Sequence, residues 1–136
     1  MKAKVQTDGE GRFGAVLINC PGCGDRHALP VRTVPAGYVE SPYYAGGAHW
    51  DFNGSLEQPT FSPSLLIRSG HYATEHKPGD SCWCTYRDEE GEPAPFACVV
   101  CHSFIRDGRI EFLNDCTHAL AGQTVDLPPV DAEQRV

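Results

Sequence analysis

The chain has 136 residues, of which 40% are hydrophobic and 21% are charged, and this favours a single folded domain over a disordered chain. The formal net charge of −7 argues against nucleic-acid binding, because an acidic surface repels phosphate backbones. The 14 Gly and 11 Pro residues disfavour long helices, and no apolar run approaches the roughly 18 residues of a membrane span.

The N-terminal region is predicted to form a hairpin followed by a tight turn. Residues 2–6 alternate polar and apolar side chains, residues 8–11 read Asp-Gly-Glu-Gly, and residues 12–19 form a second strand. Residues 20–24 are the turn, Cys-Pro-Gly-Cys-Gly, and residues 27–34 can continue beyond it as a third strand.

The middle of the chain is predicted to be mostly irregular. Pro, Gly and Tyr are frequent in residues 35–48, and residues 69–95 form a long excursion rich in Gly, Pro and acidic residues. Residues 64–68 form a short strand between these two regions. A group of aromatic and amide side chains precedes that strand, and we interpret it as core rather than as a binding surface: Trp50, Phe52, Asn53 and Phe61.

The clearest hairpin lies nearer the C-terminus. Residues 96–106 and 109–113 flank an Asp-Gly pair at residues 107–108, which is typical of a two-residue hairpin loop. Counting outward from this loop, Cys101 lies opposite Asn114. The residues that follow Asn114 are therefore expected to lie close to Cys101.

Beyond the hairpin, Asn114 or Asp115 can cap a short helix at residues 117–121, and a last short strand follows it. The sequence therefore predicts a mainly β fold, a small antiparallel β domain with one short helix. The domain is expected to span residues 1–127, and residues 128–136 form a loose tail.

Seven cysteines and six histidines are the unusual part of the composition. The cysteine count is odd, and residues 1–6 lack the apolar segment of a signal peptide. Both facts argue against a disulfide framework. They favour metal-bound or free thiols in a cytoplasmic protein.

The Cys-x-x-Cys turn is the strongest single motif. Cys20 and Cys23 stand three positions apart in a glycine-containing turn, so their thiolates can converge on one ion, and Zn²⁺ suits such ligands. A thioredoxin-like redox pair is the alternative, but that motif opens a helix. Pro21, Gly22 and Gly24 are poor material for a helix.

The remaining ligands must come from distant parts of the chain, because the turn supplies half of a tetrahedral site. The hairpin register brings Cys101 close to Cys116 and His118; the plainer alternative for the two cysteines is that they are small buried residues. The predicted zinc ligands are Cys20, Cys23, Cys101 and His118, with Cys116 and His27 as substitutes.

Cys101 and His102 are neighbours on a predicted strand, so their side chains point to opposite faces. This argues against their binding one ion and against a nucleophile–base dyad. A weaker second metal site, with free loop thiols as the alternative, would consist of Cys82 and Cys84 with Cys98 or His76.

A catalytic metal is the alternative to a structural one. An ion with an open position keeps a water, and Asp115 and His118 are the catalytic candidates if the chain is an enzyme. Otherwise Asp115 caps the helix or orients a ligating imidazole. The hydrolytic spacings His-Glu-x-x-His and His-x-Glu with Pro-Cys-x-x-Cys are absent, and thiolate-rich sites are usually closed, so a structural ion is favoured.

Four motifs span most of residues 20–127. They are Cys20-Pro-Gly-Cys23-Gly followed by His27; Phe52-Asn-Gly-Ser55 with Pro59-Thr-Phe-Ser-Pro-Ser64; Cys101-His-Ser-Phe104 with Asp107-Gly108; and Leu113-Asn-Asp115-Cys116-Thr-His118-Ala-Leu-Ala-Gly122. Together they resemble a family of small, mostly phage-encoded proteins of unknown function, sometimes labelled ammonia monooxygenase. The resemblance implies a phage or prophage origin and a host-cytoplasm location, and it transfers no established activity.

The function expected from the sequence is that of a phage-encoded zinc-binding domain. It would act as a protein-interaction or host-modulating module on a host or phage protein. A small zinc-dependent hydrolase with an open metal position is the alternative. Neither a membrane nor a nucleic acid is expected as a partner.

Overall fold

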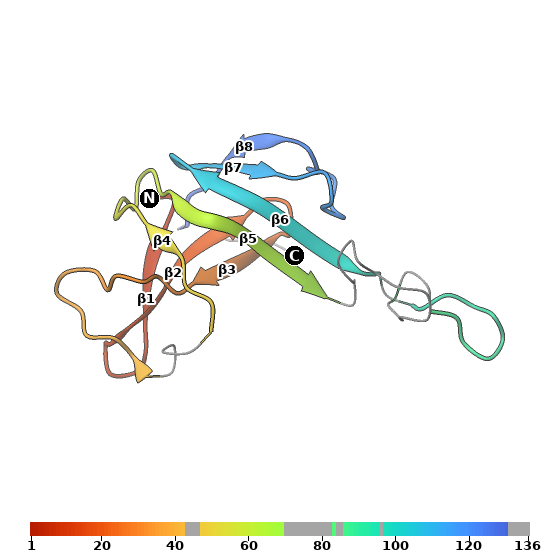
Figure 1. Cartoon of the computed structure of the whole chain (residues 1–136), viewed down its shortest axis with the longest axis horizontal. Helices are drawn as coiled ribbons and strands as arrows, with labels where there is room; N and C mark the ends of the chain where they lie inside the picture. The colour runs from red at the N-terminus through yellow and green to blue at the C-terminus, as the bar shows by residue number, and fades with distance from the viewer. Residues whose placement is uncertain (43–46, 70–82, 84–85, 96, 131–136) are drawn as a thin grey trace.

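The computed structural model describes residues 1–42, 47–69, 83, 86–95 and 97–130. Within these residues, eight strands form two antiparallel sheets (Figure 1). Neighbouring strands in each sheet are also consecutive in the chain, so both sheets are simple meanders. The prediction of a mainly β fold is confirmed.

The first sheet has the order β1-β2-β3. Its strands are β1 (Lys4–Thr7), β2 (Phe13–Cys20) and β3 (Asp25–Leu29). The central strand, β2, is buried along almost its whole length. One of its faces packs into the core, and Asn19 on the other face donates from Nδ2 to the carbonyl of Pro129 at 3.1 Å.

The second sheet has the order β4-β5-β6-β7-β8. Its strands are β4 (Asp51–Phe52), β5 (Phe61–Ser69), β6 (Val99–Arg106), β7 (Arg109–Phe112) and β8 (Thr124–Asp126). In Figure 1 the long strands β5 and β6 cross in front of the first sheet. The core lies between the two sheets, because apolar side chains of both belong to one buried cluster.

The predicted β6–β7 hairpin is present in the predicted register. Arg106 lies opposite Arg109, and Ser103 lies opposite Phe112. Asp107 and Gly108 have φ angles of 51° and 76°. Two successive positive φ values are the requirement of a type I′ turn, which explains why the Asp-Gly pair identified the hairpin correctly.

Two local predictions are wrong. The described residues contain turns at 117–121 instead of a short helix. Thr117 donates from its backbone N–H to the carbonyl of Val100 at 2.9 Å, so this segment is tied to β6 and does not begin a helix. Residues 128–130 are not loose, because Val130 is 2% exposed and its N–H reaches the carbonyl of Met1 at 3.0 Å. Residues 131–136 lie outside the described residues.

Candidate functional site

Strand β6 carries potentially reactive side chains on both of its faces. Cys101 is 0% exposed and points into the core between the sheets, whereas the neighbouring His102 is only half-buried on the opposite face. Because successive side chains of a strand alternate, the two residues belong to two separate clusters.

The first cluster lies on the core side. The ligand atoms of its residues all lie within 4.8 Å of one another, and the residues are Cys20, Cys23, His27 and Cys101. The sulfur atoms of Cys20 and Cys101 are 3.8 Å apart. Two thiolates on one tetrahedral ion, with metal–sulfur bonds of about 2.3 Å, would have nearly the same separation. The cluster can therefore hold a metal ion.

The local backbone of the turn supports this cluster. Cys20 ends β2, and its sulfur accepts a hydrogen bond from the N–H of Cys23 at 3.4 Å. Gly24 has a φ of 69°, which lets the chain reverse immediately after Cys23 and enter β3. His27 on β3 then lies opposite Ile18 on β2.

His27 is the strongest sign that the first cluster takes a ligand. It is only 7% exposed, and its Nε2 is buried without a hydrogen-bond partner among the described residues. A buried polar nitrogen in that condition costs free energy unless something binds it. A metal ion is one group that the surrounding thiols would also bind.

The thiols of the first cluster affect one another's ionisation. The hydrogen bond from Cys101 lowers the pKa of Cys20 to about 4, and nearby His27 contributes in the same direction. Burial raises the pKa of Cys23 to about 11, and the bond to Cys20 raises the pKa of Cys101 well above its usual range. One thiolate therefore forms readily while a second is disfavoured, and a bound cation would favour the ionised form of each thiol.

A second group of possible ligands adjoins the first: Cys101, Cys116 and His118. The sequence correctly placed Cys116 and His118 near Cys101. His118 packs on the Cys-x-x-Cys turn so closely that a Cβ on Gly22 would collide with its imidazole ring. Its Nε2 is also buried without a hydrogen-bond partner among the described residues. The four-residue cluster contains His27, the predicted substitute, in the place that we expected His118 to take.

The second cluster lies on the other face of β6. The His102 imidazole lies between a carboxylate and a hydroxyl: its Nδ1 is 3.0 Å from Oδ2 of Asp115, and its Nε2 is 3.1 Å from Oγ of Ser64. Serine, histidine and aspartate in this order form the relay by which a hydroxyl is activated as a nucleophile.

Strand register brings Ser64 to His102. Leu66 of β5 lies opposite His102 of β6, and Ser64 stands two positions before Leu66 on the same strand. The register shifts between Phe61 and Leu65, so Ser64 itself has no partner on β6, and the 3.1 Å contact between its Oγ and His102 Nε2 shows that its hydroxyl projects on the same side of the sheet as the imidazole. Trp50 adds a bond from Nε1 to the carbonyl of Ser64 at 3.3 Å.

A short segment after β7 brings Asp115 to His102. The N–H of Leu113 donates to the carbonyl of His102 at 2.9 Å. The Cys116 sulfur accepts from the N–H of His102 and donates to its carbonyl, both at 3.2 Å. Asp115 lies between these two attachments. The side chains of His102 and Asp115 are 26% and 51% exposed, so solutes can reach this cluster.

The sequence pointed to Asp115 as a candidate but paired it with His118. It did not identify Ser64 and His102 as its neighbours. The argument against a nucleophile–base dyad considered only Cys101, the neighbour of His102 in the sequence. The partners of His102 in the structure come from other segments of the chain. The missed signal was present in the motifs. Ser64, His102 and Asp115 all lie within the four motifs that carried the family resemblance.

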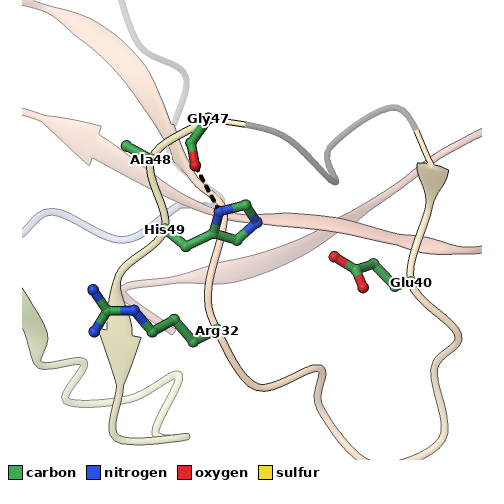
Figure 2. A pocket seen from close by; sticks show the side chains of 5 residues that line it. All are labelled: Arg32, Glu40, Gly47, Ala48 and His49. Atoms are coloured by element: carbon green, nitrogen blue, oxygen red, sulfur yellow. Dashed lines mark hydrogen bonds between the residues drawn. The ribbon is translucent and has the colours of Figure 1, made fainter.

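The other candidates are placed as follows. Cys98 is buried at 5% exposure, and the remaining members of the weaker second site, Cys82, Cys84 and His76, lie outside the described residues. A surface hollow lined by Arg32, Glu40 and residues 47–49 shares no residue with either cluster (Figure 2). Within the described residues, no helix has the length and apolar character needed to cross a bilayer.

Comparison with known proteins adds one finding. The family model described as "Bacterial ubiquitination-like system serine protease (BubE)" matches residues 2–113, a range that includes Ser64 and His102. No curated protein and no solved structure matches the chain. The function expected from the sequence was a phage zinc-binding interaction module, with a zinc hydrolase as its alternative. The family match contradicts this expectation, because the family is described as a serine protease.

Proposed function

We propose that this chain, which belongs to the bacterial ubiquitination-like system serine protease (BubE) family, is a serine protease with Ser64 as its nucleophile. His102 acts as the general base and acid. Asp115 orients the imidazole of His102 and stabilises its protonated form. The carrying observation is the position of that imidazole, within hydrogen-bond distance of both Ser64 Oγ and Asp115 Oδ2.

The geometry supports acyl transfer in two stages. Ser64 Oγ attacks the carbonyl carbon of the scissile bond while His102 Nε2 takes the hydroxyl proton, and the same nitrogen then protonates the leaving amine. A water then attacks the acyl-serine ester, again giving its proton to His102, and releases the carboxylate product. Throughout, Asp115 accepts a hydrogen bond from Nδ1–H and stabilises the imidazolium.

The substrates follow from the family description. It places the protease in a bacterial ubiquitination-like system. We therefore propose that the enzyme cleaves a protein of such a system at an amide bond. The exposure of His102 and Asp115 suits this role, because a protein substrate must approach the relay from solvent.

For the first cluster we propose a structural Zn²⁺ held by Cys20, Cys23, His27 and Cys101. Three thiols and one imidazole are a ligand set that zinc prefers, and four protein ligands leave no position for a substrate. When bound, the ion supplies folding energy and no chemistry to the triad. Cys101 directly precedes His102, so the cluster fixes the strand from which the catalytic imidazole projects.

The test is hydrolysis of p-nitrophenyl acetate, a small ester that any activated serine can accept. Ser64→Ala should lower the rate constant for enzyme acylation by about 10³-fold or more. Ser62→Ala, an exposed serine of the same strand, is the matched control and should stay within about twofold. Equal rates for Ser64→Ala and the wild-type enzyme would refute the assignment of the nucleophile.

A further inference from the structure

Strand β5, which carries Ser64, is paired unequally on its two sides. On one side it pairs with β6, with register partners at Phe61 and from Leu65 to Ser69 and a register shift between Phe61 and Leu65. On the other side β4 pairs only with Phe61 and Ser62. Figure 1 shows β4 beside the beginning of β5 alone. Among the described residues, no strand pairs with β5 on this side from Ser64 onward.

The hydrogen-bond pattern shows which backbone groups face this open side. The N–H and carbonyl of His102 are bonded to Cys116 and Leu113, on the side of β6 away from β5. Leu66 lies opposite His102, so this is a pair without mutual backbone bonds, and the N–H and carbonyl of Leu66 point away from β6. By alternation, those of Arg68 do the same.

The position of Ser64 agrees with this pattern. Its carbonyl bonds to the indole of Trp50, which lies on the side of β5 away from β6. The open edge therefore begins directly after the Ser64 carbonyl, which Trp50 occupies, and it consists of the outward N–H and carbonyl of Leu66 and of Arg68. These groups are spaced to pair with an extended chain.

Two apolar side chains of the edge are accessible to solvent. Leu66 is 46% exposed and Ile67 is 38% exposed. Leu66 lies on the same face as Ser64 and His102, directly beside the triad. An apolar side chain of a chain paired with β5 would cover Leu66.

We propose that the open edge of β5, from Ser64 to Ser69, binds the substrate as an added β-strand. This inference rests on the proposed protease function. The occupant is an extended, unfolded segment of the substrate protein, such as a tail or a linker between folded parts. Main-chain pairing with Leu66 and Arg68 holds the segment so that one of its amide bonds lies at Ser64. The enzyme thus selects flexible segments and leaves folded regions intact.

The test removes one edge donor without disturbing the sheet. Leu66→Pro eliminates the outward N–H, and proline is tolerated where that group makes no bond to a neighbouring strand. The measured quantity is the ratio of kcat/KM for unfolded, fluorescently labelled casein to kcat/KM for p-nitrophenyl acetate. This ratio should fall by about tenfold or more, because the small ester cannot use the edge. Leu66→Ala retains the N–H, and its ratio should fall less.

A second measurement needs no variant. A peptide spanning one casein cleavage site is methylated at one backbone nitrogen at a time and given to the wild-type enzyme. Pairing predicts that cleavage is lost at alternate positions. An unchanged ratio for Leu66→Pro, or equal losses at successive methylated positions, would overturn the proposal. The proposed protease function fails separately, if the wild-type enzyme hydrolyses neither casein nor the ester.

Discussion

The two faces of β6 differ in how far solvent reaches their side chains. On the core face, Cys101 is 0% exposed within a cluster of possible metal ligands. On the other face, His102 keeps 26% of its side chain exposed and joins Ser64 to Asp115. A structural ion is most stable when it is closed off from water, and a catalytic serine must be reached by its substrate. Strand alternation satisfies both needs with adjacent residues.

The two faces are nevertheless linked through the segment that follows β7. The Asp115 carboxylate contacts His102 of the triad. The sulfur of the next residue, Cys116, lies within 4.8 Å of the ligand atoms of Cys101 and His118. The Cys116 sulfur also bonds to the backbone of His102. Changes on the core face should therefore reach the triad, whereas changes in the triad should leave the core face intact.

The largest expected effect is that of His102→Ala. Loss of the general base should lower the acylation rate by about 10³-fold or more. The metal content and the melting temperature should stay those of the wild-type enzyme, because His102 is not part of the metal cluster. Elemental analysis and thermal unfolding check this, and loss of the metal in this variant would contradict the separation of the two faces.

The neighbouring substitution Cys101→Ser should behave in the opposite way. Losing a thiolate ligand removes metal-binding energy that acts as folding energy, and the cost should be about 3 kcal/mol or more of unfolding free energy. Activity should fall together with metal content, since the strand carrying His102 loses its anchor. Denaturant unfolding measures the change. A Cys101→Ser protein with full metal content and unchanged stability would show that the core cluster holds no metal through Cys101.

Asp115→Asn tests the contribution of the carboxylate within the triad. The amide cannot stabilise the imidazolium, so kcat should fall by about 10²-fold. This is less than for His102→Ala, because the imidazole remains next to Ser64. Steady-state kinetics with p-nitrophenyl acetate checks the ranking. If Asp115→Asn retained wild-type kcat, Asp115 would not be the orienting carboxylate.

Gly22→Ala probes the core face without removing a ligand. The added Cβ collides with the His118 ring, and such overpacking costs about 1–3 kcal/mol. Gly9→Ala is the matched control, since a Cβ there meets nothing within 4 Å. Thermal unfolding of both variants measures the difference, and equal melting temperatures would place His118 away from the turn.

The smallest effect is expected at the link between the faces. Thr117 Oγ1 accepts from the N–H of Val100 at 3.0 Å. Thr117→Val keeps the shape and removes this bond together with the one that Oγ1 donates to the Val100 carbonyl at 3.3 Å, which should cost about 1 kcal/mol of unfolding free energy. Denaturant unfolding measures it. A variant as stable as wild type would mean that this bond does not contribute to holding the segment that carries Asp115.

Sequence patterns predicted the parts of the molecule that local geometry determines. The Asp107-Gly108 loop fixed the β6–β7 register, and this correctly brought Cys116 and His118 to Cys101. The register of β5 on β6 is different, because β5 ends at Ser69 and β6 begins at Val99, a separation too long in sequence for the register to be counted from a two-residue loop. The contact between the side chains of Ser64 and His102 depends on that register, so the triad was not predictable from local signals.

The predicted helix at residues 117–121 failed for a related reason. The capping and glycine signals there are local, whereas the bonds that shape the segment are made to a distant strand. Thr117 and Cys116 bond to the backbone of Val100 and His102. Tertiary hydrogen bonds thus outweighed a weak helical preference.

We propose above that Ser64 is an activated nucleophile in a relay with His102 and Asp115. The most direct test is reaction with a fluorophosphonate, which forms a covalent bond with activated serine hydroxyls, followed by peptide mass spectrometry. We expect a single adduct on Ser64 that disappears in His102→Ala, while that variant keeps its metal and its fold. Absence of an adduct from the folded wild-type enzyme, or an adduct on another serine, would show that Ser64 is not the activated nucleophile.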